Sequence, residues 1–115
     1  MHIWEEAVAQ QQERREQQRR ALLRTVSEAL AELARQVPFT EAYIFGSVTQ
    51  PERFSASSDV DIAFVGLRDE DFFKALAFLM DRLARDVDIV QLERYSRKDQ
   101  IIREGIRWTK PAGPS

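Results

Sequence analysis

The sequence contains no cysteine and no asparagine, and only four glycines and four prolines among its 115 residues. The lack of cysteine excludes disulfides, thiolate catalysis and Cys-ligated zinc, and it fits a reducing compartment. No apolar run is long enough to cross a bilayer, and the N-terminal stretch carries two glutamates where a signal peptide needs its apolar segment. We therefore expect a cytoplasmic protein without a membrane segment.

Basic and acidic residues are nearly equal in number, which gives a formal net charge of −2. The composition therefore gives no argument for binding to nucleic acids or membranes. A chain of 115 residues suits one compact domain and is too short for a catalytic domain plus a separate substrate domain. A large substrate would have to lie partly outside this chain.

A long stretch without glycine or proline, from Trp4 to about Arg35, predicts a helix. Its second half carries apolar residues at helical spacing, which predicts one face packed on a core: Leu22, Leu23, Val26, Ala29, Leu30, Leu33 and Val37. The first half, QQQERREQQRR, has almost no apolar face, so it either projects into solvent or meets a partner. Its arginines alternate with glutamates, which favours a solvated helix face over direct nucleic-acid binding.

The rest of the chain alternates between apolar strands and amphipathic helices. Strands are predicted at Ala42–Phe45, Val60–Val65 and Val87–Leu92, and a helix at Asp69–Arg85. A last helix, capped by Ser96, would hold Ile101, Ile102, Ile106 and Trp108. This order predicts an α/β domain with a small mixed sheet flanked by helices.

Two pairs of aspartates stand at the starts of predicted strands. Asp59 and Asp61 are two residues apart, so their side chains leave the same face, with Cα atoms roughly 6.5–7 Å apart. Asp86 and Asp88 repeat this arrangement in the next strand. If the two strands are neighbours, a third carboxylate converges on the first pair, and such a cluster of oxygen donors is what Mg²⁺ prefers.

The dipeptide Gly46-Ser47 follows a predicted strand directly. Glycine lets backbone N–H groups approach a phosphate closely, and serine adds a hydroxyl at the start of a helical turn. Together with the carboxylates, this pair predicts metal-assisted phosphoryl or nucleotidyl transfer.

The order of these features, GS…SDVDIAF followed by VDIV, resembles the minimal nucleotidyltransferases (MNT) of the DNA polymerase beta-like superfamily. The resemblance covers about Thr40 to Trp108, including a closing REGIRW. Together with the predicted long helix and the composition of the last five residues, PAGPS, it divides the chain into an N-terminal helix at 1–36 as a packing or partner surface, a nucleotidyltransferase core at 37–110 and a disordered tail at 111–115.

The resemblance also implies roles for the site residues. Gly46 and Ser47 would bind the triphosphate, and Asp59 and Asp61 would hold two Mg²⁺ ions. Asp88 would be the third carboxylate and the base, with Asp86 as a weaker candidate for that position.

One part of the sequence departs from the family pattern. Eleven residues separate Ser47 from Asp59, and the loop lacks the arginine and glycine that relatives often place soon after the serine. The extra residue costs little, but the missing glycine puts the grip on the triphosphate in question. Arg53 could replace the missing positive charge, although a solvated loop arginine is the plainer interpretation.

The family also implies a partner, because MNT proteins are typically paired with a small helical HEPN protein. By this resemblance the chain would transfer AMP from ATP to an acceptor hydroxyl as the antitoxin of a HEPN/MNT pair. The alternative is a catalytically weak or inactive module that neutralises or scaffolds the HEPN partner by binding alone. The sequence leaves the acceptor, the nucleotide preference and a homo-oligomer open.

Overall fold

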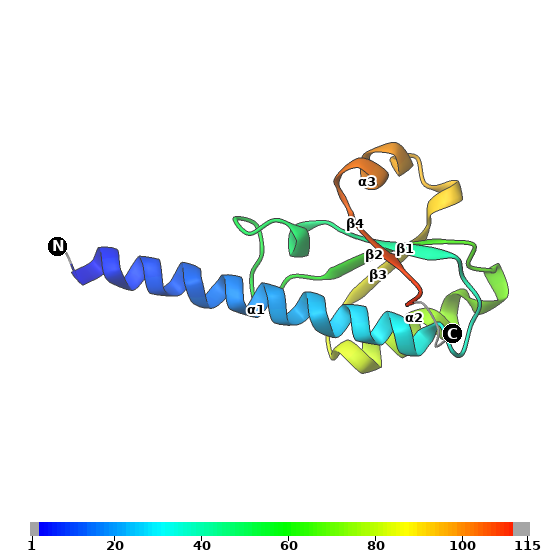
Figure 1. Cartoon of the computed structure of the whole chain (residues 1–115), viewed down its shortest axis with the longest axis horizontal. Helices are drawn as coiled ribbons and strands as arrows, with labels where there is room; N and C mark the ends of the chain where they lie inside the picture. The colour runs from blue at the N-terminus through cyan, green and yellow to red at the C-terminus, as the bar shows by residue number, and fades with distance from the viewer. Residues whose placement is uncertain (1–2, 112–115) are drawn as a thin grey trace.

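The computed structural model of the chain describes residues 3–111 and contains three helices and four strands in that range (Figure 1). In chain order these are α1 (Ile3–Leu33), β1 (Glu41–Phe45), β2 (Val60–Val65), α2 (Phe72–Leu83), β3 (Val87–Gln91), α3 (Lys98–Glu104) and β4 (Ile106–Thr109). Short 3₁₀ turns occur at Ser47–Thr49 (η1), Asp69–Asp71 (η2) and Leu92–Arg94 (η3). Most of the predicted tail at 111–115 lies outside the described residues.

The four strands form one mixed sheet in the order β3-β2-β1-β4. β1 pairs antiparallel with β2 and with β4, whereas β2 and β3 run parallel. The parallel pair requires a crossover connection, which α2 provides. The structure therefore confirms the predicted small mixed sheet flanked by helices.

Helices cover the sheet on both faces, with α1 and α2 on one side and α3 on the other (Figure 1). The face of β2 toward α1 and α2 carries Val60, Ile62 and Phe64, all fully buried. Alternate residues of this strand therefore pack on the helices, because side chains of a strand point to opposite faces in turn. The opposite face forms a smaller cluster beneath α3, made of Tyr43, Ala63, Leu92 and Ile101. Asp61 and Asp88 belong to this second face, because they alternate with the buried residues of the first.

The long helix α1 is divided into a packed half and a projecting half. Its C-terminal half buries the predicted apolar face, with Leu22, Val26, Ala29, Leu30 and Leu33 in the main core. Its N-terminal half extends beyond the sheet (Figure 1) and is almost entirely exposed. Across residues 3–111, no helix combines the length and the apolar character needed to span a bilayer.

The predicted last helix is wrong in its C-terminal part. α3 ends at Glu104, and Ile106 and Trp108 belong to β4, which pairs with β1. Gly105 makes this change of direction possible, because a Cβ at this position would lie 2.7 Å from the carbonyl oxygen of Ile101. Trp108 is buried as expected, but it reaches the core from a strand and packs against Phe39 with ring centroids 5.7 Å apart.

Ser96 is not the cap of α3. The N-cap is Arg97, and no side-chain hydrogen bond caps the helix. A 3₁₀ turn also replaces the first turn of the predicted helix at 69–85, so that α2 begins only at Phe72.

Candidate functional site

The turn after β1 requires glycine for its backbone conformation. Gly46 has φ 82° and ψ −158°, a region that side chains disfavour. The turn then closes through hydrogen bonds from the N–H groups of Thr49 and Gln50 to the carbonyl oxygens of Gly46 (3.0 Å) and Ser47 (3.1 Å). The Thr49 hydroxyl donates a further bond to the Gly46 carbonyl at 2.7 Å. Gly46–Thr49 is therefore a closed turn directly at the end of a strand.

Asp61 lies against this turn. In the antiparallel pair of β1 and β2, Phe45 is opposite Asp61. A Cβ added to Gly46 would lie 2.2 Å from Oδ2 of Asp61. Glycine is thus needed at position 46 for its positive φ and also because the Asp61 carboxylate occupies the space of a side chain.

Asp88 stands beside Asp61 on the neighbouring strand. The parallel pair of β2 and β3 sets Asp61 in register with Asp88, and neighbouring strands lie about 4.8 Å apart. Asp59 directly precedes β2, and its charge lies near enough to act on the carboxyl of Asp61. The two strands are neighbours, so the condition under which a third carboxylate approaches the first pair is met.

The environment of Asp61 disfavours its charge. Burial raises the pKa of this carboxyl, and the negative charges of Asp88 and then Asp59 raise it further. Asp86 is exposed and precedes β3, and its backbone carbonyl accepts a hydrogen bond from Val60. The carboxylates that act on Asp61 are therefore those of Asp59 and Asp88.

Arg85 fixes the loop end that leads into Asp59. Its Nη1 donates a hydrogen bond to the Ser58 carbonyl oxygen at 2.9 Å. Its Nε is buried and, among residues 3–111, has no hydrogen-bond partner. The guanidinium thus holds the backbone next to Asp59.

A cleft of about 250 Å³ opens between the turn and α3. Its walls combine the turn, the loop after it and the α3 region: Phe45, Gly46, Thr49, Gln50, Arg53, Asp61, Tyr95, Arg97, Gln100, Ile101, Glu104 and Gly105. The rings of Phe45 and Tyr95 lie against each other with centroids 6.1 Å apart. Of the predicted site residues, Gly46 and Asp61 line this cleft, whereas Ser47, Asp59 and Asp88 lie outside its walls.

Several of these lining residues were not predicted from the sequence. Four of them come from the segment around α3, for which the sequence predicted only a helix with apolar residues: Tyr95, Arg97, Gln100 and Glu104. The polar run before Ile101 was the available signal. Arg53, which the sequence favoured as a solvated loop residue, lies on the cleft wall.

The three carboxylates fit a hard cation in their chemistry. Within residues 3–111, no three acidic or histidine side chains are gathered closely enough to form a finished metal site. However, one end of two adjacent strands carries all three carboxylates, those of Asp59, Asp61 and Asp88. Burial and the negative charges of the other two carboxylates disfavour the ionised form of Asp61. A divalent cation would relieve both effects, so the residues suit Mg²⁺.

Comparison with known proteins gives a consistent result. Residues 10–109 match the family described as polymerase beta, nucleotidyltransferase. Among solved structures, the chain is similar to a toxin–antitoxin with AMP-PNP, with 27% identity, 74% of each chain covered and a TM-score of 0.60. A mutant of the toxin–antitoxin MntA-HpeT is 26% identical, with 74% of each chain covered and a TM-score of 0.58.

A further solved structure is that of a minimal nucleotidyltransferase. It is 28% identical, with 73% of this chain and 90% of that chain covered and a TM-score of 0.56. A search of curated proteins found no match.

Proposed function

This chain belongs to the polymerase beta nucleotidyltransferase family, and we propose that it transfers AMP from ATP to an acceptor hydroxyl in a Mg²⁺-dependent reaction. The observation that carries the proposal is the packing of Asp61 against Gly46 and its register with Asp88. This arrangement places the Gly46–Thr49 turn, to which we assign the triphosphate, beside the carboxylates of Asp61 and Asp88. A structural neighbour solved with AMP-PNP supports ATP as the donor.

In the proposed reaction each predicted residue has a defined task. Gly46 and Ser47 bind the triphosphate through the turn, and Asp59 and Asp61 hold the metal. The Mg²⁺ that these residues would hold would supply positive charge against the negative charge of the triphosphate and of the leaving pyrophosphate. The positive side chain of Arg53 on the cleft wall would add to this attraction.

Asp88 takes the proton of the acceptor. Its side chain is exposed, so it can reach a hydroxyl on a separate molecule. As the proton moves to Asp88, the acceptor oxygen bonds to the α-phosphorus, and the bond from that phosphorus to pyrophosphate breaks. The products are an adenylylated acceptor and pyrophosphate.

The acceptor in this proposal belongs to a toxin partner of the HEPN family, with this chain as the antitoxin. Two neighbours are toxin–antitoxin structures, which supports a partner of that kind. The projecting half of α1 offers a contact surface, because Ile3 and Trp4 are 84% and 68% exposed near its start. Exposed tryptophans are frequent anchors of protein interfaces.

A second candidate is a module that neutralises its partner by binding alone. It is favoured by the fact that, in the described part of the chain, the carboxylates do not form a finished metal site. The two candidates differ in whether a covalent product appears.

The test is transfer of label from ATP to a purified HEPN-family protein. With Mg²⁺, the wild-type chain should label that protein from [α-³²P]ATP and not from [γ-³²P]ATP. Asp88→Asn should remove the label and keep the complex, whereas the control Asp86→Asn should retain both. A stable complex that gives no label under these conditions would favour the binding-only candidate, and equal labelling by Asp88→Asn would contradict the role of Asp88.

A further inference from the structure

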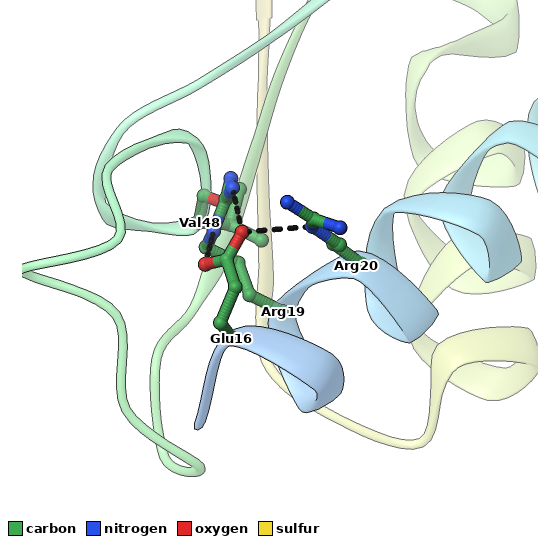
Figure 2. A network of polar contacts seen from close by, with 4 residues as sticks. All are labelled: Glu16, Arg19, Arg20 and Val48. Carbon is green, nitrogen blue, oxygen red and sulfur yellow. Dashed lines mark hydrogen bonds and ion pairs between the residues drawn. The ribbon is translucent and has the colours of Figure 1, made fainter. Parts of the chain in front are cut away.

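Near its midpoint, α1 is hydrogen-bonded through a side chain to the turn that follows Gly46. The guanidinium of Arg19 donates to both carboxylate oxygens of Glu16, at 2.8 and 2.7 Å, and its Nη1 donates to the Val48 carbonyl oxygen at 3.2 Å (Figure 2). Arg20 donates to the same glutamate at 3.0 Å. The side chain of Arg19 is only 12% exposed, whereas that of Arg20 is 70% exposed. One arginine is therefore held against the turn, and its neighbour reaches solvent.

The backbone of the turn has no N–H group in position to donate to the Val48 carbonyl oxygen. The backbone bonds of the turn run from Thr49 and Gln50 to the carbonyls three residues earlier. The next bond in this series would reach the Val48 carbonyl from Pro51, and proline has no N–H. Gln50 is also extended, with φ −122° and ψ 110°, as expected for a residue before proline. Arg19 thus supplies a donor that Pro51 cannot.

The turn is fixed from two sides at Val48. The Val48 side chain is fully buried in the main core, and its carbonyl oxygen accepts the bond from Arg19. A guanidinium suits this bridge, because its planar fork binds Glu16 with one edge and leaves another N–H for the carbonyl. A lysine ammonium is a point charge on a flexible stem and cannot reproduce this geometry.

We propose that Arg19, oriented by Glu16, is a positioning residue for the Gly46–Thr49 turn, and that it sets the affinity of this turn for a nucleoside triphosphate. The affinity part rests on the proposed function, in which the turn holds the triphosphate. Arg19 does not line the cleft, so it acts through the turn and not by contact with the nucleotide. The polar half of α1 then supports the nucleotide site through this turn.

The first measurement needs no nucleotide. Amide hydrogen exchange is followed at Thr49 and Gln50 in the wild-type chain and in Arg19→Gln, Arg19→Lys and Arg20→Gln. Both Arg19 variants should speed exchange of the two amides by about tenfold or more, because a hydrogen bond from a charged group is lost. Amides of the paired strands β1 and β2 should keep their wild-type rates.

Arg20→Gln is the matched control. It removes the same charge from the same helix and also loses a bond to Glu16, but it does not touch the turn. Exchange at Thr49 and Gln50 should stay within about twofold of the wild-type rate. Wild-type rates in a folded Arg19→Gln, or equal acceleration by Arg20→Gln, would overturn the proposal.

The second measurement is the dissociation constant for Mg²⁺-ATP by calorimetry. Arg19→Gln should weaken binding about tenfold or more, and Arg20→Gln should change it less than about twofold. Unchanged binding by Arg19→Gln would overturn the proposed effect on affinity. If the wild-type chain binds no nucleotide, the proposed function fails, and the exchange rates still decide whether Arg19 positions the turn.

Discussion

Replacing Asp61 by asparagine should stabilise the protein in the absence of metal. The substitution keeps the shape of the side chain and removes a charge that burial and the neighbouring carboxylates disfavour. Asp61 and Asp88 lie in register on adjacent strands, which places their charges about 6 Å apart for a strand spacing of about 4.8 Å. Removal of the repulsion between these two carboxylates should therefore give Asp61→Asn a larger free energy of unfolding than wild type.

Coulomb's law gives the size of this gain. Two unit charges about 6 Å apart repel by about 0.7 kcal/mol in water and about 2.8 kcal/mol at an effective dielectric constant of about 20. Because Asp88 is exposed, solvent screening brings the value toward the lower limit. We expect a gain of about 1 kcal/mol, or a rise in Tm of about 4 °C.

The assay is urea unfolding at pH 7 in EDTA and at low ionic strength, for wild type, Asp61→Asn and Asp86→Asn. The control removes an equal charge at the same end of the sheet and should change stability by less than about 0.5 kcal/mol. Addition of Mg²⁺ should stabilise wild type and leave Asp61→Asn almost unchanged.

The stability difference between wild type and Asp61→Asn should depend on pH. A raised pKa of Asp61 means that the folded state binds the proton more tightly than the unfolded state. The contribution of Asp61 to stability is therefore fully present below its ordinary pKa of 3.8 and is lost as the pH rises through the folded value. The advantage of Asp61→Asn should be largest at neutral pH and vanish near pH 3. An Asp61→Asn protein less stable than wild type at pH 7 would refute this reasoning.

Three other predictions test separate parts of the structure. Gly46→Ala should cost about 1–3 kcal/mol in urea unfolding because of its backbone conformation, and part of the loss should disappear when Asp61→Ala removes the carboxylate against which the new Cβ would clash. The pKa of Glu16 is lowered from 4.5 to about 2 by its hydrogen bond with an arginine, so its stabilising effect is present above pH 4.5 and lost as the pH falls toward 2. The difference in Tm between wild type and Glu16→Gln should therefore shrink as the pH falls from 4.5 toward 2. Leu30→Ala should cost about 2–5 kcal/mol because the side chain is fully buried, whereas Met80→Ala, at a 42% exposed position, should cost less than about 1 kcal/mol in the same melts.

Each of these substitutions has an outcome that contradicts its premise. Full additivity of Gly46→Ala and Asp61→Ala would show that the two residues do not compete for space. A Tm difference for Glu16→Gln that is independent of pH would exclude an ionised, bonded Glu16. Similar costs for Leu30→Ala and Met80→Ala would contradict the assignment of Leu30 to the core.

Local patterns in the sequence predicted most of the fold. The short apolar run from Val60 to Val65 identified the strand, because such runs are typical of buried strands. The helical spacing from Leu22 to Leu33 identified the packed half of α1 for a similar reason. Both features depend on residues close in sequence.

The features that the sequence did not reveal depend on residues far apart in the chain. β4 is four residues long and forms a strand because it pairs with β1, whereas Ile101, Ile102 and Ile106 fit a helical pattern locally. The contact of Arg19 with Val48 joins residues 29 positions apart. No local periodicity encodes such a contact, so it required the structure.

The roles of the candidate site residues stay predictions. The two-residue spacing of Asp59 and Asp61 predicted a common face, and the register of β2 and β3 places Asp88 beside Asp61. The steric fit of Asp61 to Gly46 depends on the antiparallel register of β1 and β2, which the spacing of Gly46 and Asp61 does not determine. The contribution of the α3 region to the cleft depends on how that helix packs over the sheet.

If the turn and the carboxylates together form a nucleotide site, calorimetric titration with Mg²⁺-ATP should detect it. We expect metal-dependent binding by wild type, binding retained by Asp86→Asn, and binding lost in the double variant Asp59→Asn/Asp61→Asn. Folding of each protein is confirmed by urea unfolding. If wild type binds none of the four nucleoside triphosphates with millimolar Mg²⁺, or if the double variant binds as well as wild type, the account is contradicted.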